Sequence, residues 1–236
     1  MKSIKAFIFA RGGSKGLPNK NILPIEGLTL VERAILVAKS MQEIDQIFLS
    51  TDSKKIAELS EKYDIELIRR PSYLASDNSP EWLSWQHAIK YVQKQYGEFD
   101  CFLSLPPTSP LRKKIDLQRT INALKDNVDL VITMSEARRN PWFNMVIKDS
   151  KGNLRLVGES SVIFNRQEAP SCFDIATVAY AALPEYVLNS DNMWSGNVNG
   201  VLIPQERSID IDNEFDFNLA QLLIKNENSK NQSNNS

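Results

Sequence analysis

The strongest chemical signal in the chain is a basic, glycine-rich loop that directly follows its first apolar segment. Ile4–Phe9 reads as a short strand, and the run ARGGSKGLPNKN comes next, at 10–21. Glycines let a backbone approach a bulky anion and turn its N–H groups toward it. Arg11, Lys15 and Lys20 add positive charge suited to phosphate oxygens. Because α/β folds bind phosphates at the carboxyl end of the first strand, the loop predicts a nucleoside triphosphate site.

The loop matches neither common phosphate-binding motif. Leu17 stands where a Walker A sequence has its lysine, and Gly12, Gly13 and Gly16 do not have the dinucleotide spacing. The alternative is an ordinary solvated turn, since Gly and Lys are frequent in loops. Three cations interleaved with glycines after a strand favour the binding interpretation.

A pair of carboxylates near the C-terminus forms the second candidate group. Asp210 and Asp212 are two residues apart in an extended run, so both side chains can project from one face. Paired carboxylates suit a hard divalent cation such as Mg²⁺, which can bridge phosphate oxygens. Alternatively, Asp212 only caps a helix that begins near Asn213.

Four further residues can be interpreted in two ways. Thr108 and Ser109 end a central strand, where their hydroxyls can bond a phosphate or sugar, or cap the following turn. His87 is the sole histidine and lies in a predicted helix, where a packing or capping role is favoured over catalysis. Cys101 lies in a strand-like run and is expected to be a buried thiol rather than a nucleophile.

The loop and four later motifs together resemble the acylneuraminate cytidylyltransferases, the CMP-sialic acid synthetases. The later motifs occur in the family's order and cover nearly the whole chain: STD at 50–52, RP through LASDNS at 70–79, PTSPLR at 107–112 and SIDID at 208–212. Such enzymes transfer CMP from CTP to a nine-carbon keto-sugar acid, a nonulosonic acid, and release pyrophosphate. The resemblance therefore implies CTP, a sugar acid and Mg²⁺ as ligands.

The resemblance also implies roles for individual residues. Arg11 and Asn21 would contact the nucleotide, Lys15 and Lys20 the phosphates, and Arg70 and Ser79 the cytidine, with Asp77 between those two. The binding residues expected on this basis are Arg11, Gly12, Lys15, Lys20, Asn21, Arg70, Asp77, Ser79, Thr108 and Ser109, with Asp210 and Asp212 for the metal. Arg166 belongs to RQEAP, which matches an active-site motif of the family. A guanidinium there suits the sugar's carboxylate, so Arg11, Lys15 and Arg166 are the expected catalytic residues. Alternatively, Arg166 only forms an ion pair at an interface.

Composition limits the other possibilities. The 236 residues include 42% hydrophobic residues, enough for one α/β domain with a sizeable core. The net charge of −1 offers no overall basic field for nucleic acid or membrane. Neither a signal peptide nor a membrane span is recognisable, so a cytoplasmic location is expected.

Helix-like and strand-like segments alternate along the first half, which predicts a mostly parallel sheet with helices on both faces. With the resemblance, this implies a Rossmann-like nucleotidyltransferase fold of the α/β class. The predicted helices are 29–41, 53–63, 80–96, 115–124 and 214–224; the predicted strands are 4–9, 46–50, 66–68, 101–105, 130–134, 177–183 and 200–203. In the last helix, Phe215, Leu219, Leu222 and Leu223 are expected to face inward.

The alternation stops at residue 135. The segment 135–172 carries two apolar runs around the turn DSKGN, which predicts a protruding β-hairpin arm. So much apolar surface suggests that a second copy covers it, and the family dimerises through a similar arm. We expect one domain over 1–226, a homodimer formed through 135–172, and a disordered polar tail at 227–236.

Three departures from the sialic acid pattern bear on the sugar. Pro106 replaces the glutamine that usually precedes PTSPLR, and Phe143 replaces a lysine common after the hairpin's proline. The strand usually reading GA[IV]Y is TVAY at 177–180, and the run 137–144 is more similar to legionaminic acid enzymes. A less polar lining predicts a preference for a legionaminic-type sugar over N-acetylneuraminate. The alternatives are a synthetase for an eight-carbon sugar acid and a non-catalytic nucleotide-binding homologue.

Overall fold

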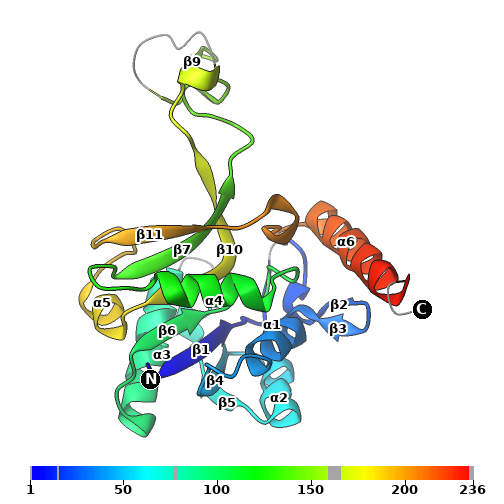
Figure 1. Cartoon of the computed structure of the whole chain (residues 1–236), viewed down its shortest axis with the longest axis vertical. Helices are drawn as coiled ribbons and strands as arrows, with labels where there is room; N and C mark the ends of the chain where they lie inside the picture. Colours follow the sequence, from blue (N-terminus) through cyan, green and yellow to red (C-terminus); the bar gives the residue numbers. More distant parts are fainter. Residues whose placement is uncertain (1, 15, 77–78, 159–165, 234–236) are drawn as a thin grey trace.

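The computed structural model describes residues 2–14, 16–76, 79–158 and 166–233, and its centre is a seven-stranded sheet (Figure 1). The strand order is β11-β7-β10-β6-β1-β4-β5. The strands are β1 Ile4–Phe9, β4 Gln46–Thr51, β5 Glu66–Arg69, β6 Cys101–Ser104, β7 Leu130–Glu136, β10 Phe173–Ala182 and β11 Val198–Leu202. Every neighbouring pair is parallel except those made by β10, which runs antiparallel to β6 and β7. The predicted α/β fold with a mostly parallel sheet is confirmed.

Helices cover both faces of this sheet, as the alternating pattern predicts. They are α1 Leu30–Lys39, α2 Lys54–Tyr63, α3 Glu81–Tyr96, α4 Lys114–Ala123, α5 Pro184–Asn189 and α6 Glu214–Ser233. Strand β1 shows how one sequence serves two cores, because its side chains alternate between faces. Ile4, Ala6 and Ile8 pack in a cluster with α1 and α4, whereas Phe7 and Phe9 pack with α3. None of the helices in the described ranges is long and apolar enough to cross a membrane.

Two helix starts follow directly from the sequence. Thr29 caps α1 in a capping box with Glu32, and Ser53 accepts a hydrogen bond from the Ile56 N–H at the start of α2. Thr29 is the last residue of β3 (Leu28–Thr29), and Ser53 follows β4. The two caps therefore fix where helices α1 and α2 begin.

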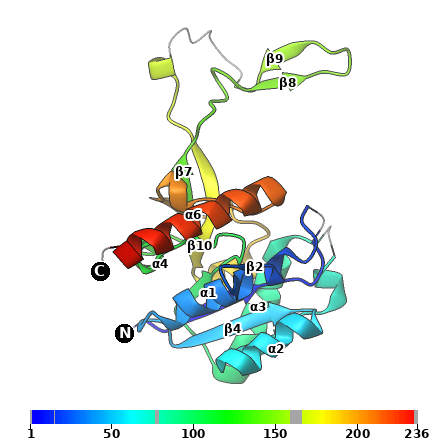
Figure 2. The same cartoon turned by 90° about the vertical axis from the view of Figure 1, so that its right-hand side faces the viewer.

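The arm is an extension of two core strands. β7 and β10 continue beyond the sheet and carry the hairpin of β8 (Val146–Lys148) and β9 (Leu154–Leu156) at their far end (Figure 2). The β7–β10 register shifts between Ala176 and Tyr180. The Thr133 hydroxyl fills this bulge, since it bonds the Ala179 carbonyl at 3.0 Å and accepts from the Ala179 N–H at 3.1 Å.

The second half differs from the prediction in three places. Helix α5 was not predicted, and β10 begins four residues earlier than expected because it extends into the arm. Residues 227–233, expected to belong to a disordered tail, continue α6, because the polar run contains no Gly or Pro that would stop a helix. Phe215, Leu219 and Leu222, expected to face inward, are exposed, whereas Ala220 and Ile224 pack on the core.

The remaining short elements connect these parts. They are the 3₁₀ turns η1 Lys20–Ile22, η2 Ser72–Leu74, η3 Arg166–Glu168 and η4 Gln205–Arg207, and the strand β2 Pro24–Ile25, which pairs with β3. The turns η1 and η2 lie beside the site described next.

Candidate functional site

A cavity of about 370 Å³ opens at the carboxyl ends of the parallel strands β1, β5 and β6. This is the edge where open α/β sheets bind ligands. Most of the residues predicted to bind a nucleotide or metal line it together: Arg11, Lys20, Asn21, Arg70, Ser79, Thr108, Asp210 and Asp212. The fold therefore brings four separate sequence motifs to one place.

Several predicted residues do not line this cavity or cannot be placed. Ser109 is buried below the surface, where its hydroxyl bonds that of Thr177 at 2.8 Å. The Gly12 N–H donates to the Asp52 carboxylate at 2.9 Å instead of facing the cavity. Lys15 and Asp77 lie outside the described residues. Arg166 begins η3, in the arm.

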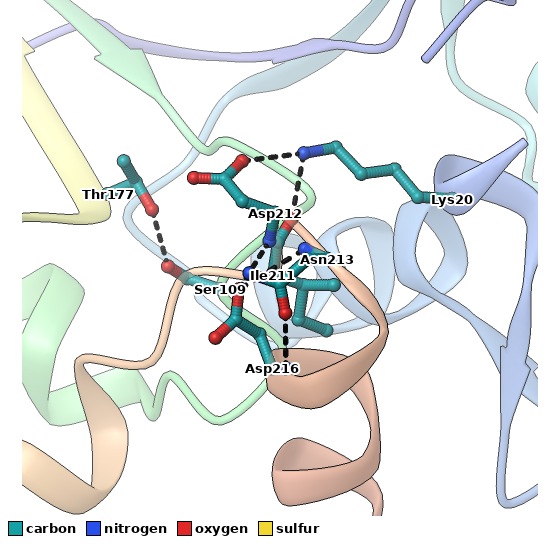
Figure 3. A network of polar contacts seen from close by, with 7 residues as sticks. All are labelled: Lys20, Ser109, Thr177, Ile211, Asp212, Asn213 and Asp216. Carbon is teal, nitrogen blue, oxygen red and sulfur yellow. Dashed lines mark hydrogen bonds and ion pairs between the residues drawn. The ribbon is translucent and has the colours of Figure 1, made fainter. Parts of the chain in front are cut away.

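The basic loop is tied to the aspartate segment. Lys20 Nζ donates to the Asp212 carboxylate at 3.0 Å and to the Ile211 carbonyl at 2.7 Å (Figure 3). A side chain at Gly16 would collide with the Asp212 carbonyl, so glycine permits this close approach. Asn21 is buried and donates to the Arg11 carbonyl at 3.0 Å, which holds the loop's entry and exit together.

Asp212 is also held from the other side. Its N–H and that of Asn213 donate to the Asp216 carboxylate at 3.0 and 3.2 Å, and Asp216 lies in the first turn of α6 (Figure 3). The capping role considered for Asp212 therefore belongs to Asp216 and Asn213. The Asp212 carboxylate itself stays 72% exposed and is available to the cavity.

Arg70 is fixed at the wall of the cavity by strand β4 and the end of β1. Its guanidinium donates to the Ser50 carbonyl at 3.0 Å and to the Ser50 hydroxyl at 3.3 Å. The same group lies 5.5 Å from the centre of the Phe9 ring, a cation–π contact. Burial lowers the pKa of Arg70, while Glu81 and Asp52 oppose that shift. The geometry presents a pre-positioned cation to a ligand.

One carboxylate oxygen of Asp210 is buried in the site. Its Oδ1 is buried and has no hydrogen-bond partner among the described residues. Beneath it lies Arg112, whose pKa is lowered to about 9 by burial, with Asp210 and Asp116 opposing the shift. An unsatisfied buried carboxylate oxygen is costly, and a bound cation would remove that cost.

The donor set fits Mg²⁺ bound jointly with a substrate phosphate. No cluster of three or more His, Cys, Asp or Glu suited to a metal occurs among the described residues. Mg²⁺ commonly takes only one or two carboxylates, with water and phosphate oxygens completing its shell. Asp210 and Asp212 supply that number from the cavity wall.

Two residues of the site were missed by the sequence reasoning. Glu81 lines the cavity and accepts from Trp85 Nε1 at 3.2 Å, and desolvation raises its pKa although Arg70 opposes this. Glu81 follows Pro80 at the start of a helix, where acidic residues are common, so the sequence gives no sign that it belongs to the site. In the sequence, Arg112 stands out only as the last residue of PTSPLR. In the structure its guanidinium donates to the carbonyls of Pro106 and Ser109 and so holds that loop in place.

The two residues considered for other chemistry are not in the cavity wall. Cys101 is buried, and burial raises its pKa to about 12, as expected for an inert thiol. His87 lies on α3, where burial and then Arg70 lower its pKa. Its Nδ1 is buried without a partner in the described part of the chain.

The chain matches a known protein family over most of its length. The cytidylyltransferase family model matches residues 6–181. The chain is 32% identical to the post-translational flagellin modification protein B of Campylobacter coli, over 97% of both chains. It is 31% identical to the CMP-N,N'-diacetyllegionaminic acid synthase of Campylobacter jejuni, over 95% of this chain and 96% of that one.

A solved structure shares the fold at much lower identity. It is a CMP-2-keto-3-deoxy-manno-octonic acid synthetase complexed with CTP, with a TM-score of 0.71, 14% identity, and coverage of 95% of this chain and 99% of that one. The family match includes the basic loop, Arg70 and the PTSPLR motif, and the acylneuraminate and legionaminic synthetases are among the relatives. The chain is a nucleotidyltransferase that belongs to the cytidylyltransferase family, in the acylneuraminate group that includes the legionaminic branch.

Proposed function

We propose that this enzyme transfers CMP from CTP to the anomeric hydroxyl of a nonulosonic acid. The observation that carries the proposal is one cavity, at the carboxyl ends of the strands, that is lined by Arg11, Lys20 and Asp210, the last with a buried carboxylate oxygen that has no partner among the described residues. Cations and paired carboxylates together suit a triphosphate that arrives with a divalent ion.

The reaction needs charge neutralisation and alignment more than covalent help. The sugar hydroxyl oxygen forms a bond to the α-phosphorus and its proton is released to water. The bond from that phosphorus to the bridging oxygen breaks, and pyrophosphate leaves with the electron pair. Arg11 and Lys20 would balance the charge that develops on the phosphate oxygens. Asp210 and Asp212 would hold Mg²⁺, which when bound adds positive charge beside the same oxygens.

The sugar we propose is of the N,N'-diacetyllegionaminic type. Two relatives that match this chain over more than nine tenths of its length are synthases named for that sugar, from Campylobacter jejuni and Legionella pneumophila. Pro106 lies in the cavity wall and offers no side-chain donor there. Phe143, the other expected contact, is not among the cavity residues and lies in the arm.

We also propose a homodimer, and the position of Arg166 supports it. The resemblance implies that this arginine binds the carboxylate of the sugar, yet η3 lies in the arm, which stands away from the sheet that carries the cavity (Figure 2). A role for Arg166 in catalysis then requires that the arm of a second copy reaches the cavity. Phe143 also lies in the arm, so it too would reach a cavity only in a second copy.

Pyrophosphate release tests the proposed reaction. The enzyme would be assayed with CTP, Mg²⁺ and a panel of N,N'-diacetyllegionaminic acid, N-acetylneuraminic acid and the eight-carbon acid 2-keto-3-deoxy-manno-octonic acid. We expect the highest kcat/KM with the legionaminic sugar. A clear preference for N-acetylneuraminate would refute the sugar assignment, and activity with only the eight-carbon acid would refute the nonulosonic class. CTP binding without turnover of any sugar would favour a non-catalytic homologue.

A further inference from the structure

Helix α6 is apolar on two opposite sides. Ala220 and Ile224 are buried against Ile25, Leu30 and Leu111 of the core. On the outer side, Phe215, Leu219 and Leu222 follow each other at helical spacing and are 75%, 37% and 55% exposed; we call these three residues the α6 stripe. Apolar side chains that line up along one face of a helix are normally covered, so the stripe points to a partner surface.

The hairpin of the arm has a matching uncovered face. Val146 pairs with Leu156 and Lys148 with Leu154, so these four side chains lie on one side of the two-stranded sheet. Val146, Leu154 and Leu156 are 56%, 64% and 39% exposed. We call this group of four residues the hairpin face. It presents three apolar side chains and one cation to solvent.

The two surfaces carry opposite charge. The stripe begins beside an acidic segment in which Asp212 and Glu214 are exposed, and the next basic residue along α6 is Lys225. Residues 137–158, which contain the hairpin face, include five basic residues and one acidic one. Opposite charge around two apolar patches steers their association and disfavours pairing of either patch with itself.

A single chain does not bring these surfaces together. The arm carries the hairpin beyond the edge of the sheet. Helix α6 instead packs against the core, below the point where the arm begins (Figure 2). In a two-fold dimer the hairpin face of each copy would contact the α6 stripe of the other, because the symmetry repeats every contact once. We propose that the hairpin face of one copy packs on the α6 stripe of its partner; this rests on the proposed homodimer.

Site-directed cross-linking tests the contact itself. Both variants would carry Cys172→Ser, which leaves only the buried Cys101, and one would add Leu222→Cys and the other Val146→Cys. When the two variants are co-expressed with different tags and treated with a short bismaleimide, we expect a covalent product that carries both tags. Products that link only Val146→Cys copies to one another would show hairpin-to-hairpin packing and overturn the proposal. An intact dimer that yields no mixed-tag product would also overturn it while leaving the homodimer standing.

A charge substitution measures the strength of the contact. Leu222→Asp should raise the dimer dissociation constant by about 30-fold or more, as expected when a central apolar contact is lost. Ile115→Asp is the matched control, because Ile115 is a comparably exposed apolar residue, at 50%, on α4. Circular dichroism of both variants checks that they fold. Equal dissociation constants for the wild type and Leu222→Asp would overturn the docking surface, and a monomeric wild type would overturn the homodimer as well.

Discussion

At the scale of single residues, the site is built from charges that are held before any ligand arrives. Lys20 is tied to Asp212, Arg70 to Ser50, and Asn21 to the backbone of Arg11. Preorganised charge costs no rearrangement when the transition state forms, which is why it contributes strongly to phosphoryl-group chemistry. The exception is the Asp210 carboxylate, which keeps one buried oxygen unsatisfied and so favours an incoming cation.

Replacing Asp212 tests the metal assignment. We expect Asp212→Ala to abolish turnover, because the carboxylate that would share the cation with Asp210 is gone. CTP binding, followed by calorimetry, should survive in part through Arg11 and Arg70. Asp191→Ala, at an exposed position outside the cavity, is the control. Near-normal Mg²⁺-dependent pyrophosphate release by Asp212→Ala would show that the assignment is wrong.

Replacing Arg11 tests the loop. Arg11→Ala should reduce kcat/KM about 10²-fold, since it removes a charge-assisted contact near the reacting phosphate. The same loss is expected for Lys15→Ala, whereas Lys90→Ala on the exposed side of α3 should have no effect. Thermal unfolding would be measured in parallel. A loss of activity fully explained by unfolding would contradict a catalytic role for the loop.

At the scale of elements, helix α1 is fixed by a network that depends on ionisation. The Glu32 carboxylate accepts from the Thr29 N–H, Lys62 Nζ and the Tyr63 hydroxyl at 2.9, 2.6 and 2.8 Å. Burial alone would raise the pKa of Glu32, but these hydrogen bonds outweigh it and lower the pKa from 4.5 to about 2. The network joins the start of α1 to the end of α2 and so supports the layer beneath the basic loop.

A carboxyl group whose pKa is lowered by folding stabilises the fold at any pH above its unfolded pKa. This contribution is lost as the pH falls through the pKa of the folded state. For Glu32 the window runs from pH 4.5 down to about 2. Urea unfolding at pH 7 should therefore show Glu32→Gln to be less stable than the wild type by about 2 kcal/mol, and the difference should shrink below about 1 kcal/mol near pH 2. Glu58→Gln, on the exposed face of α2, should show no such dependence. A pH-independent difference for Glu32→Gln would argue against the ionised network.

Local signals predicted most of the first half, and tertiary context decided the rest. The caps Thr29 and Ser53 act within four residues, so the sequence shows them directly. The antiparallel direction of β10 depends on pairing with β6 and β7, far away in sequence. The exposed stripe on α6 has the same apolar spacing as a buried one, and spacing alone does not say which side meets the core. Glu81 joins the site only because α3 starts at the cavity.

At the scale of the whole molecule, the arm is the surface through which we propose that two copies assemble. Its exposed apolar side chains exceed what a monomer normally presents to water: Phe143, Met145, Val146, Ile147, Leu154, Leu156, Val157, Phe173 and Ile175 are each at least 39% exposed. We expect light scattering at micromolar concentration to give twice the 26.8 kDa mass of one chain. Raising the salt concentration should weaken the assembly only modestly, because apolar burial would dominate it. A single-chain mass under these conditions would contradict the homodimer.

The bulge in β10 has a consequence for how such enzymes diverge. Thr177 lies within the irregular stretch between Ala176 and Tyr180 and also lines the cavity. A rotation of the strand at this bulge would therefore move the distant hairpin and the Thr177 part of the cavity wall together. Substitutions at the bulge would then alter the geometry of the proposed homodimer and the shape of the pocket in the same step. A change of sugar preference would be coupled in this way to a change in the angle of the arm.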